Sequence, residues 1–185
     1  MLPLDEIKPQ QSIELLKSLH ILTRDGKINQ DSRRKLKQVY HLYQFIEPIL
    51  TEVSIDKAPF HVIDHGAGKS YLGFILYDLF IKLTQGRVTG IEINPALVEK
   101  SQELAKTLAF DRMSFVQADV AHALEEVKDR VDVVTALHAC DTATDDAIHF
   151  GIHKEAQWIV VVPCCQAELA SHLKKNKSIM LDNPL

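Results

Sequence analysis

The segment from Asp64 to Ser70 holds the residues whose types and spacing best suit a chemical role. It reads Asp64-His65-Gly66-Ala67-Gly68-Lys69-Ser70 and directly follows the mainly apolar run 60–63. Two glycines this close together let a backbone turn tightly and approach a ligand. Because the apolar run 71–83 comes next, the segment predicts a strand, a turn and a packed helix, with a ligand over the N-terminus of that helix.

The spacing of the glycines separates three kinds of nucleotide-binding turn. A P-loop ending in Gly68-Lys69-Ser70 needs a glycine at position 63, where the chain has Ile63. A dinucleotide turn needs a third small residue where Tyr71 stands, which disfavours a nicotinamide enzyme. The remaining pattern, an acid two positions before the first glycine, resembles the first motif of the class I S-adenosylmethionine (SAM) methyltransferases. That resemblance implies cofactor contacts from Asp64, His65, Gly66, Ala67 and Gly68.

Two further acids come at the ends of later strands. Glu92 ends a predicted strand over 87–92, and Asp119 follows one over 113–117. Glu92 lies one strand-helix-strand crossover after Asp64, where a carboxylate can accept hydrogen bonds from both hydroxyls of a ribose. The resemblance implies that Asp119 accepts a hydrogen bond from the adenine amine, and it adds Ile93 and Val120 to the predicted cofactor contacts.

The order of the elements predicts an α/β fold with a Rossmann-like parallel sheet covered on both faces. The predicted strands cover 60–64, 87–92, 113–117, 131–137 and 158–162, and the helices 69–83, 95–108, 120–128, 143–150 and 167–175. Residues 1–55 form a predicted helical prefix with helices over 10–19 and 32–50, the second capped by Asp31 or Ser32. Residues 56–185 form the predicted SAM-binding domain.

The cysteines lie beyond the fourth and fifth predicted strands, at Cys140, Cys164 and Cys165. Three interpretations stay open: packed small side chains, a metal site shared with His138, or a catalytic thiolate. We expect packed side chains and no metal. For a hydroxyl acceptor, His138 or Asp141 is the predicted general base, with His138 preferred. A thiolate-based RNA 5-methylcytosine enzyme would instead use cysteines after the fourth and fifth strands, which are Cys140 and Cys165 here.

The runs 64–72, 137–145 and 162–166 resemble the signatures of a little-characterised methyltransferase family, with H-x-C-x-x-A-T-D and P-C-C patterns. The family is related to the tRNA 2′-O-methyltransferases of the acceptor stem, to the rRNA adenine dimethylase-domain-containing proteins and to the glutathione S-transferase C-terminal domain-containing protein. The resemblance spans residues 33–168 and implies methyl transfer to tRNA or rRNA, with His138 also near the cofactor. Asp141 stands where several relatives carry Gly. A non-catalytic SAM-binding or scaffold module is the alternative.

Class I domains of this kind have two strands after the fifth, and residues 167–185 have room for one short strand. We therefore expect a sheet that lacks its last two strands, with strand 158–162 as an apolar edge that binds a second copy or a completing segment. The chain alone is expected to bind SAM and to transfer little methyl.

The charge balance restricts the partners. The net charge of −4 and pI of about 6.1 exclude a general coat of basic side chains for nucleic acid. A local RNA contact is predicted at Arg33, Arg34, Lys35 and Lys37. The chain shows neither a leader nor a membrane-spanning run, so we expect a cytoplasmic protein.

Overall fold

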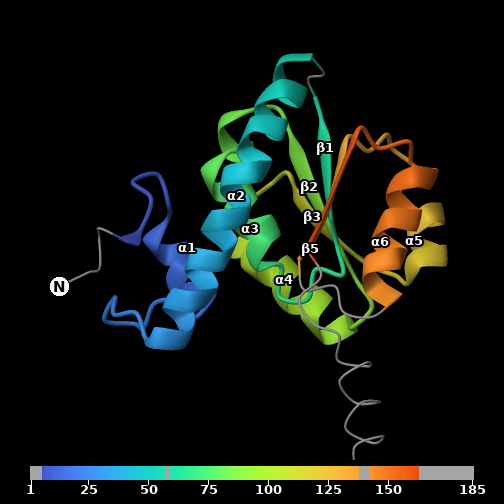
Figure 1. Ribbon diagram of the computed structural model, residues 1–185. Helices are drawn as coiled ribbons and strands as arrows, with labels where there is room; N and C mark the ends of the chain where they lie inside the picture. Colours follow the sequence, from blue (N-terminus) through green and yellow to red (C-terminus); the bar gives the residue numbers. More distant parts are fainter. Residues whose placement is uncertain (1–5, 57–58, 138–141, 163–185) are drawn as a thin grey trace, which may run out of the picture.

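The computed structural model describes residues 6–56, 59–137 and 142–162. A parallel sheet of five strands lies between two layers of helices (Figure 1). Its strands are β1 (His61–His65), β2 (Arg87–Glu92), β3 (Met113–Gln117), β4 (Val133–Leu137) and β5 (Trp158–Val162). The order β3-β2-β1-β4-β5 reverses on either side of β1, and every pair is parallel. The predicted Rossmann-like sheet is confirmed.

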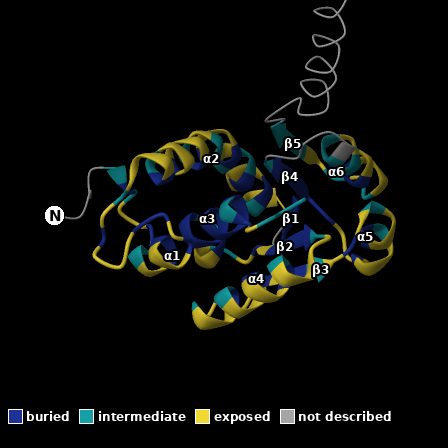
Figure 2. Cartoon of the chain, turned by 90° about the horizontal axis from the view of Figure 1, so that it is seen from below, coloured by how far each residue is buried: buried dark blue, intermediate teal, exposed yellow. Residues whose placement is uncertain are grey.

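The helices divide between the two faces of the sheet. They are α1 (Ile13–Ser18), α2 (Gln30–Asp56), α3 (Tyr71–Leu79), α4 (Pro95–Thr107), α5 (Val120–Glu126), α6 (Thr142–His153) and the 3-10 turn η2 (Ile81–Leu83). One core joins the apolar side chains of α1 to α4 to one face, and a second joins those of α5 and α6 to the other. Seen from below in Figure 2, the dark blue of buried residues covers most of the sheet and α3. No helix in the described ranges is long and apolar enough to cross a bilayer.

The first helices are fixed to the core by one buried carboxylate. Asp78 on α3 is 1% exposed, and its Oδ2 accepts hydrogen bonds from the Gln11 side chain and from the Ser12 amide at 2.7 Å. Its Oδ1 pairs with Lys82 Nζ at 2.6 Å. These bonds tie the start of α1 to the end of α3, and the predicted prefix shares one hydrophobic core with the sheet.

Helix α2 is longer at both ends than the predicted 32–50. The predicted cap at Asp31 or Ser32 is wrong, because Asn29 Oδ1 accepts the hydrogen bond from the Ser32 amide at 2.8 Å. At the other end the helix continues through Pro48 to Asp56, since burial of Leu50 and Val53 outweighs the backbone hydrogen bond that proline lacks.

The helix predicted over 69–83 is divided into α3 and η2. Ser70, before the first turn, has a left-handed backbone with φ of 50°, and its hydroxyl donates to Asp64 Oδ2 at 2.7 Å instead of capping the helix. Ser70 therefore belongs to the glycine turn, and the helix begins at Tyr71. The predicted helix over 167–175 lies outside the described residues.

Strand β5 is the edge of the sheet among the described residues. Residues 159–162 are half-buried, and Trp158 is 36% exposed. The edge position agrees with the sequence analysis. A second copy or a completing segment along this edge stays a prediction.

Candidate active site

The turn after β1 has a backbone conformation at positions 66 and 68 that favours glycine. Gly66 and Gly68 have φ of +63° and +58°, where other residues are strained. The Ala67 amide between them donates to the Ile91 carbonyl at 2.9 Å, and the Ser70 amide donates to the Ala67 carbonyl at 2.6 Å. The turn is therefore fixed to β2 and closed on itself, so it presents a rigid backbone at the end of the sheet.

Asp64 builds this turn from below. It is 2% exposed, and its Oδ2 accepts from the Ser70 hydroxyl at 2.7 Å and from the Gly73 amide at 3.3 Å. The Thr135 hydroxyl, at 3.4 Å from Oδ1, lies on its other side. Burial raises the pKa of Asp64 to about 6, although these donors favour the ionised form. The carboxylate thus holds the turn and the start of α3 together.

Gly73 is a structural residue of this turn that the sequence analysis missed. A Cβ atom there would lie 2.4 Å from Ser70 Oγ and 2.9 Å from Asp64 Oδ2. Gly73 lets the helix approach the turn closely, as the third glycine of a dinucleotide motif does. The sequence had predicted that the bulk of Tyr71 would prevent this close approach. A glycine within the apolar run 71–79 was the available signal.

Glu92 holds the turn from its open side. Its Oε2 accepts from the Gly68 amide at 2.7 Å, and its Oε1 accepts from the Asn94 amide at 2.9 Å. The side chain is half-buried, so each oxygen keeps acceptor capacity for a ligand. Because the backbone amides orient this carboxylate in advance, it is well placed to bind paired hydroxyls.

Asp119 caps the next helix. Its Oδ1 accepts from the His122 amide at 2.9 Å and lies 2.7 Å from His122 Nδ1. These hydrogen bonds lower the pKa of Asp119, and the same contact raises the pKa of His122. Oδ2 takes no part in these bonds, so the exposed carboxylate can still accept from a ligand.

Two adjoining cavities lie at the carboxyl ends of the strands, and we call them together the donor crevice. The first has a volume of about 280 Å³ and is lined by His65, Gly66, Glu92, Ile93, Asp119 and Val120, among others. The second has about 210 Å³ and is lined by Asp64, Gly66, Ala67 and Gly68, with Leu137 opposite. They meet at Gly66. Every predicted cofactor contact that the structure describes therefore lines the crevice, and its binding role stays a prediction.

His65 has polar atoms that no described residue satisfies. Its side chain is 6% exposed, packs against Phe150 with ring centroids 5.6 Å apart, and lines the first cavity. Neither ring nitrogen has a hydrogen-bond partner in the described part of the chain. Burial lowers the pKa of His65, which favours the neutral ring. A neutral imidazole offers one donor and one acceptor, so the cavity suits a polar ligand such as the adenosine of SAM.

The predicted catalytic residues His138, Cys140 and Asp141 lie outside the described residues, as do Cys164 and Cys165. The packed, metal-binding and thiolate interpretations of the cysteines therefore stay open. Leu137, the last described residue before this segment, forms part of the wall of the second cavity.

The side chains of the predicted RNA patch have different neighbours in the structure, and the RNA contact stays a prediction. Arg33 pairs with Glu6 at 2.7 Å, and Arg34 lies 3.9 Å from Asp31. Lys35, by contrast, extends to the Tyr71 ring, with Nζ 5.9 Å from the centroid. Tyr71 lines the donor crevice, so Lys35 contacts a residue of its wall.

A parallel sheet that reverses at β1, a glycine turn over α3 and acids at successive strand ends define a class I SAM-dependent methyltransferase fold. Residues 34–172, well over half of the chain, match the model of a family described as a methyltransferase domain. The chain belongs to this family.

One curated relative and two solved structures show how far the similarity extends. The glutathione S-transferase C-terminal domain-containing protein of Mus musculus is 26% identical over 153 residues, which are 83% of this chain and 22% of that protein. The N-terminal domain of human METTL16, solved with S-adenosylhomocysteine (SAH), has a TM-score of 0.54 at 13% identity, covering 77% of this chain and 60% of that one. The human methyltransferase 10 domain containing protein has a TM-score of 0.51 at 13% identity, covering 77% and 70%. Both structures share the fold.

Proposed function

We propose that this protein transfers the methyl group of SAM to RNA, with tRNA or rRNA as the acceptor. The single observation that carries the proposal is the donor crevice, where the glycine turn, Glu92 and His65 meet at the point of sheet reversal. The RNA acceptor is supported by the resemblance of the runs 137–145 and 162–166 to a family related to RNA methyltransferases.

The described residues fit the cofactor by their chemistry. Glu92 would accept from the ribose hydroxyls, and Asp119 from the adenine amine. The ring nitrogens of His65, which lack a hydrogen-bond partner among the described residues, would bond the adenosine. The space at Gly66 would admit it, since no described atom lies within 4 Å of a Cβ built there. When bound, SAM supplies a methyl group on a positively charged sulfur.

Methyl transfer to the acceptor also requires that the acceptor atom lose its proton. For a hydroxyl acceptor, His138 takes this proton as general base, with Asp141 as the second candidate. If the acceptor is a cytosine ring carbon, Cys140 adds to the ring as a thiolate instead. The two chemistries differ in whether enzyme and RNA become covalently joined.

A labelling experiment tests the proposal. The protein is incubated with methyl-labelled SAM together with total RNA and total protein, and the label in each fraction is measured. We expect label in RNA, and much less with Glu92→Ala. Label in protein alone would overturn the RNA acceptor, and SAH binding without any transfer would identify a scaffold module. A covalent adduct with 5-fluorocytosine RNA would select the thiolate route over the general base.

A further inference from the structure

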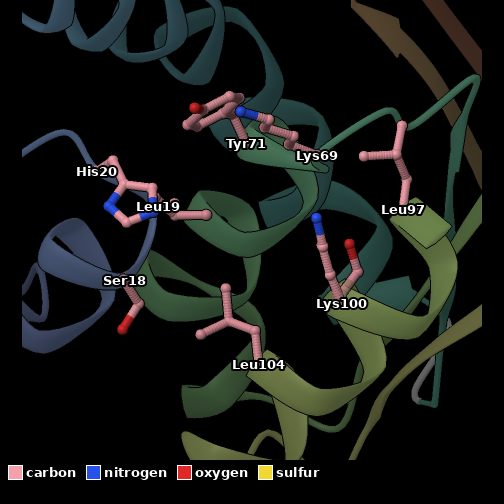
Figure 3. Close-up of a pocket in the computed structure, with 9 residues that line it drawn as sticks. Ser18, Leu19, His20, Lys69, Tyr71, Leu97, Lys100 and Leu104 are labelled. Atoms are coloured by element: carbon pink, nitrogen blue, oxygen red, sulfur yellow. The ribbon is translucent and has the colours of Figure 1, made fainter.

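A separate cavity of about 250 Å³ lies between the end of α1, the start of α3 and α4. Figure 3 shows Lys69 and Tyr71 above it, Lys100 and Leu104 on α4, and His20 on the far side. Its volume is below the range of about 300 to 1,000 Å³ that is usual for small-molecule sites. It suits one part of a larger ligand better than a complete cofactor. We call it the α1–α4 pocket.

The lining of the α1–α4 pocket combines basic and apolar side chains. Lys69, Lys100 and His20 supply the basic groups, while the apolar side chains come from Leu19, Leu97 and Leu104. None of the described residues that line the pocket is acidic, although the chain has more acidic residues than lysines and arginines. Such a combination favours an anion attached to an apolar or aromatic group.

The lysines around the pocket are not neutralised by the protein. In the part of the chain that the structure describes, no carboxylate pairs with Lys69 or Lys100, nor with Lys35 beside Tyr71. The other basic side chain at α3, Lys82, does pair with an acid, Asp78. Two positive charges that line one pocket without a carboxylate partner favour an anion bound there.

The pocket also adjoins the donor crevice. Lys69 and Tyr71 line both the α1–α4 pocket and the second cavity of the crevice. A group bound in the pocket is therefore a neighbour of whatever occupies the crevice. This placement suits a part of the acceptor molecule that lies close to the atom to be methylated.

We propose that the α1–α4 pocket binds one nucleotide of the acceptor RNA, with its phosphate held by Lys69 and Lys100 and its base or ribose against Leu97 and Tyr71. This inference rests on the proposed function, since it takes RNA as the acceptor. The first helices then serve substrate binding, because the end of α1 supplies one wall of the pocket.

The test measures RNA and cofactor binding separately. Fluorescence anisotropy with a 5′-fluorescein 12-mer of oligouridylate is compared for the wild type and the double variant Lys69→Gln/Lys100→Gln. We expect RNA affinity to fall at least tenfold and the slope of log K against log salt to fall by about 0.7, as for one lost phosphate contact on a single strand. Lys100 does not line the crevice, so calorimetry should give an SAH affinity for the single variant Lys100→Gln within twofold of the wild type.

A matched control removes two exposed lysines outside the pocket. Lys106→Gln/Lys128→Gln changes the net charge equally, and we expect less than a twofold loss of RNA affinity. Leu97→Trp fills the cavity without changing charge, and should weaken RNA at least fivefold. Equal losses of RNA affinity in the two double variants, or an unchanged RNA affinity of Leu97→Trp, would show that RNA binds through general surface charge. Either result would overturn the inference.

Two further outcomes separate this inference from the proposed function. If the Lys69/Lys100 variant loses SAH affinity and keeps RNA affinity, the pocket binds the cofactor carboxylate and the inference is wrong. If labelled methyl still reaches RNA with an unchanged KM for RNA in that variant, the inference fails while the proposed function stands. Failure of the wild type to label any RNA overturns the proposed function itself, whatever the anisotropy shows.

Discussion

The glycine turn is held by two acids, and the two sides of the turn differ in what the acid does. On the buried side, Asp64 bonds to Ser70 and Gly73 inside the core. On the open side, Glu92 bonds to the Gly68 amide with oxygens that also face a cavity. Both acids therefore hold the turn, but only the half-buried Glu92 keeps the exposure that a ligand contact would need. Substitutions on the two sides should separate stability from binding.

The largest effect is expected for the pH dependence of Asp64→Asn. The pKa of Asp64 is about 6 in the folded protein, above its ordinary value of 3.8. The folded state thus keeps a proton that the unfolded state loses between pH 4 and 6, and stability falls as pH rises through this window. His61, whose pKa burial lowers from 6.5 to about 4, has the opposite effect. The two contributions nearly cancel in the wild type.

Asn removes the contribution of Asp64 and can still accept from Ser70 and Gly73. Between pH 4 and 6.5, Asp64→Asn should therefore gain about 3 kcal/mol of unfolding free energy relative to the wild type. Urea unfolding at several pH values measures this difference. Parallel profiles of the two proteins would show that Asp64 ionises normally and would contradict the description of the buried side.

The next effect belongs to the open side. Glu92→Ala should cost about 1.5 to 3 kcal/mol of SAH affinity, because charge-assisted bonds to two hydroxyls are lost. Its stability should change little, since water can reach the Gly68 and Asn94 amides. Calorimetry measures the SAH affinity and thermal unfolding measures the stability. Glu99→Ala, on the exposed side of α4, is the control for both. A large loss of stability with unchanged SAH affinity would show that Glu92, like Asp64, holds the turn and does not bind the cofactor.

Gly73→Ala tests the buried side by crowding it. The added methyl lies within contact of Ser70 Oγ and Asp64 Oδ2, so overpacking should cost about 1 to 2 kcal/mol of stability, partly offset by the better helix propensity of Ala. Urea unfolding measures it, and binding of SAH to the folded variant should weaken only slightly. A stabilised variant would mean that the turn is not tightly packed against α3.

The smallest effect is expected at His65, where binding and stability should move in opposite directions. Phe fills a similar space beside Phe150 and removes two unsatisfied nitrogens, so His65→Phe should raise stability by about 1 kcal/mol. SAH affinity should fall several-fold, as measured by calorimetry. Unchanged affinity would show that the imidazole does not contact the ligand.

Much of the fold could be predicted because its strands end in acids and alternate with apolar helices. The helix ends were less predictable, since Asn29 and Ser70 use their side chains in ways that depend on neighbours. In the site, the sequence indicated which residues line the crevice. It gave no means to separate Asp64 from Glu92, because both are acids at strand ends, and only packing shows that one is buried. The α1–α4 pocket joins residues of three distant segments, which no spacing reveals.

The bonds of Asp78 to Gln11 and Ser12 have a consequence for any shortened form of the protein. A chain that begins after α2 would leave Asp78 without two of its donors and would uncover the apolar side of α3. Such a fragment should aggregate when expressed, even though it keeps every motif residue of the crevice. The minimal folding unit therefore includes the residues before α2 as well as the glycine turn at 64–70. Recombination that separates the first helices from the sheet would be selected against.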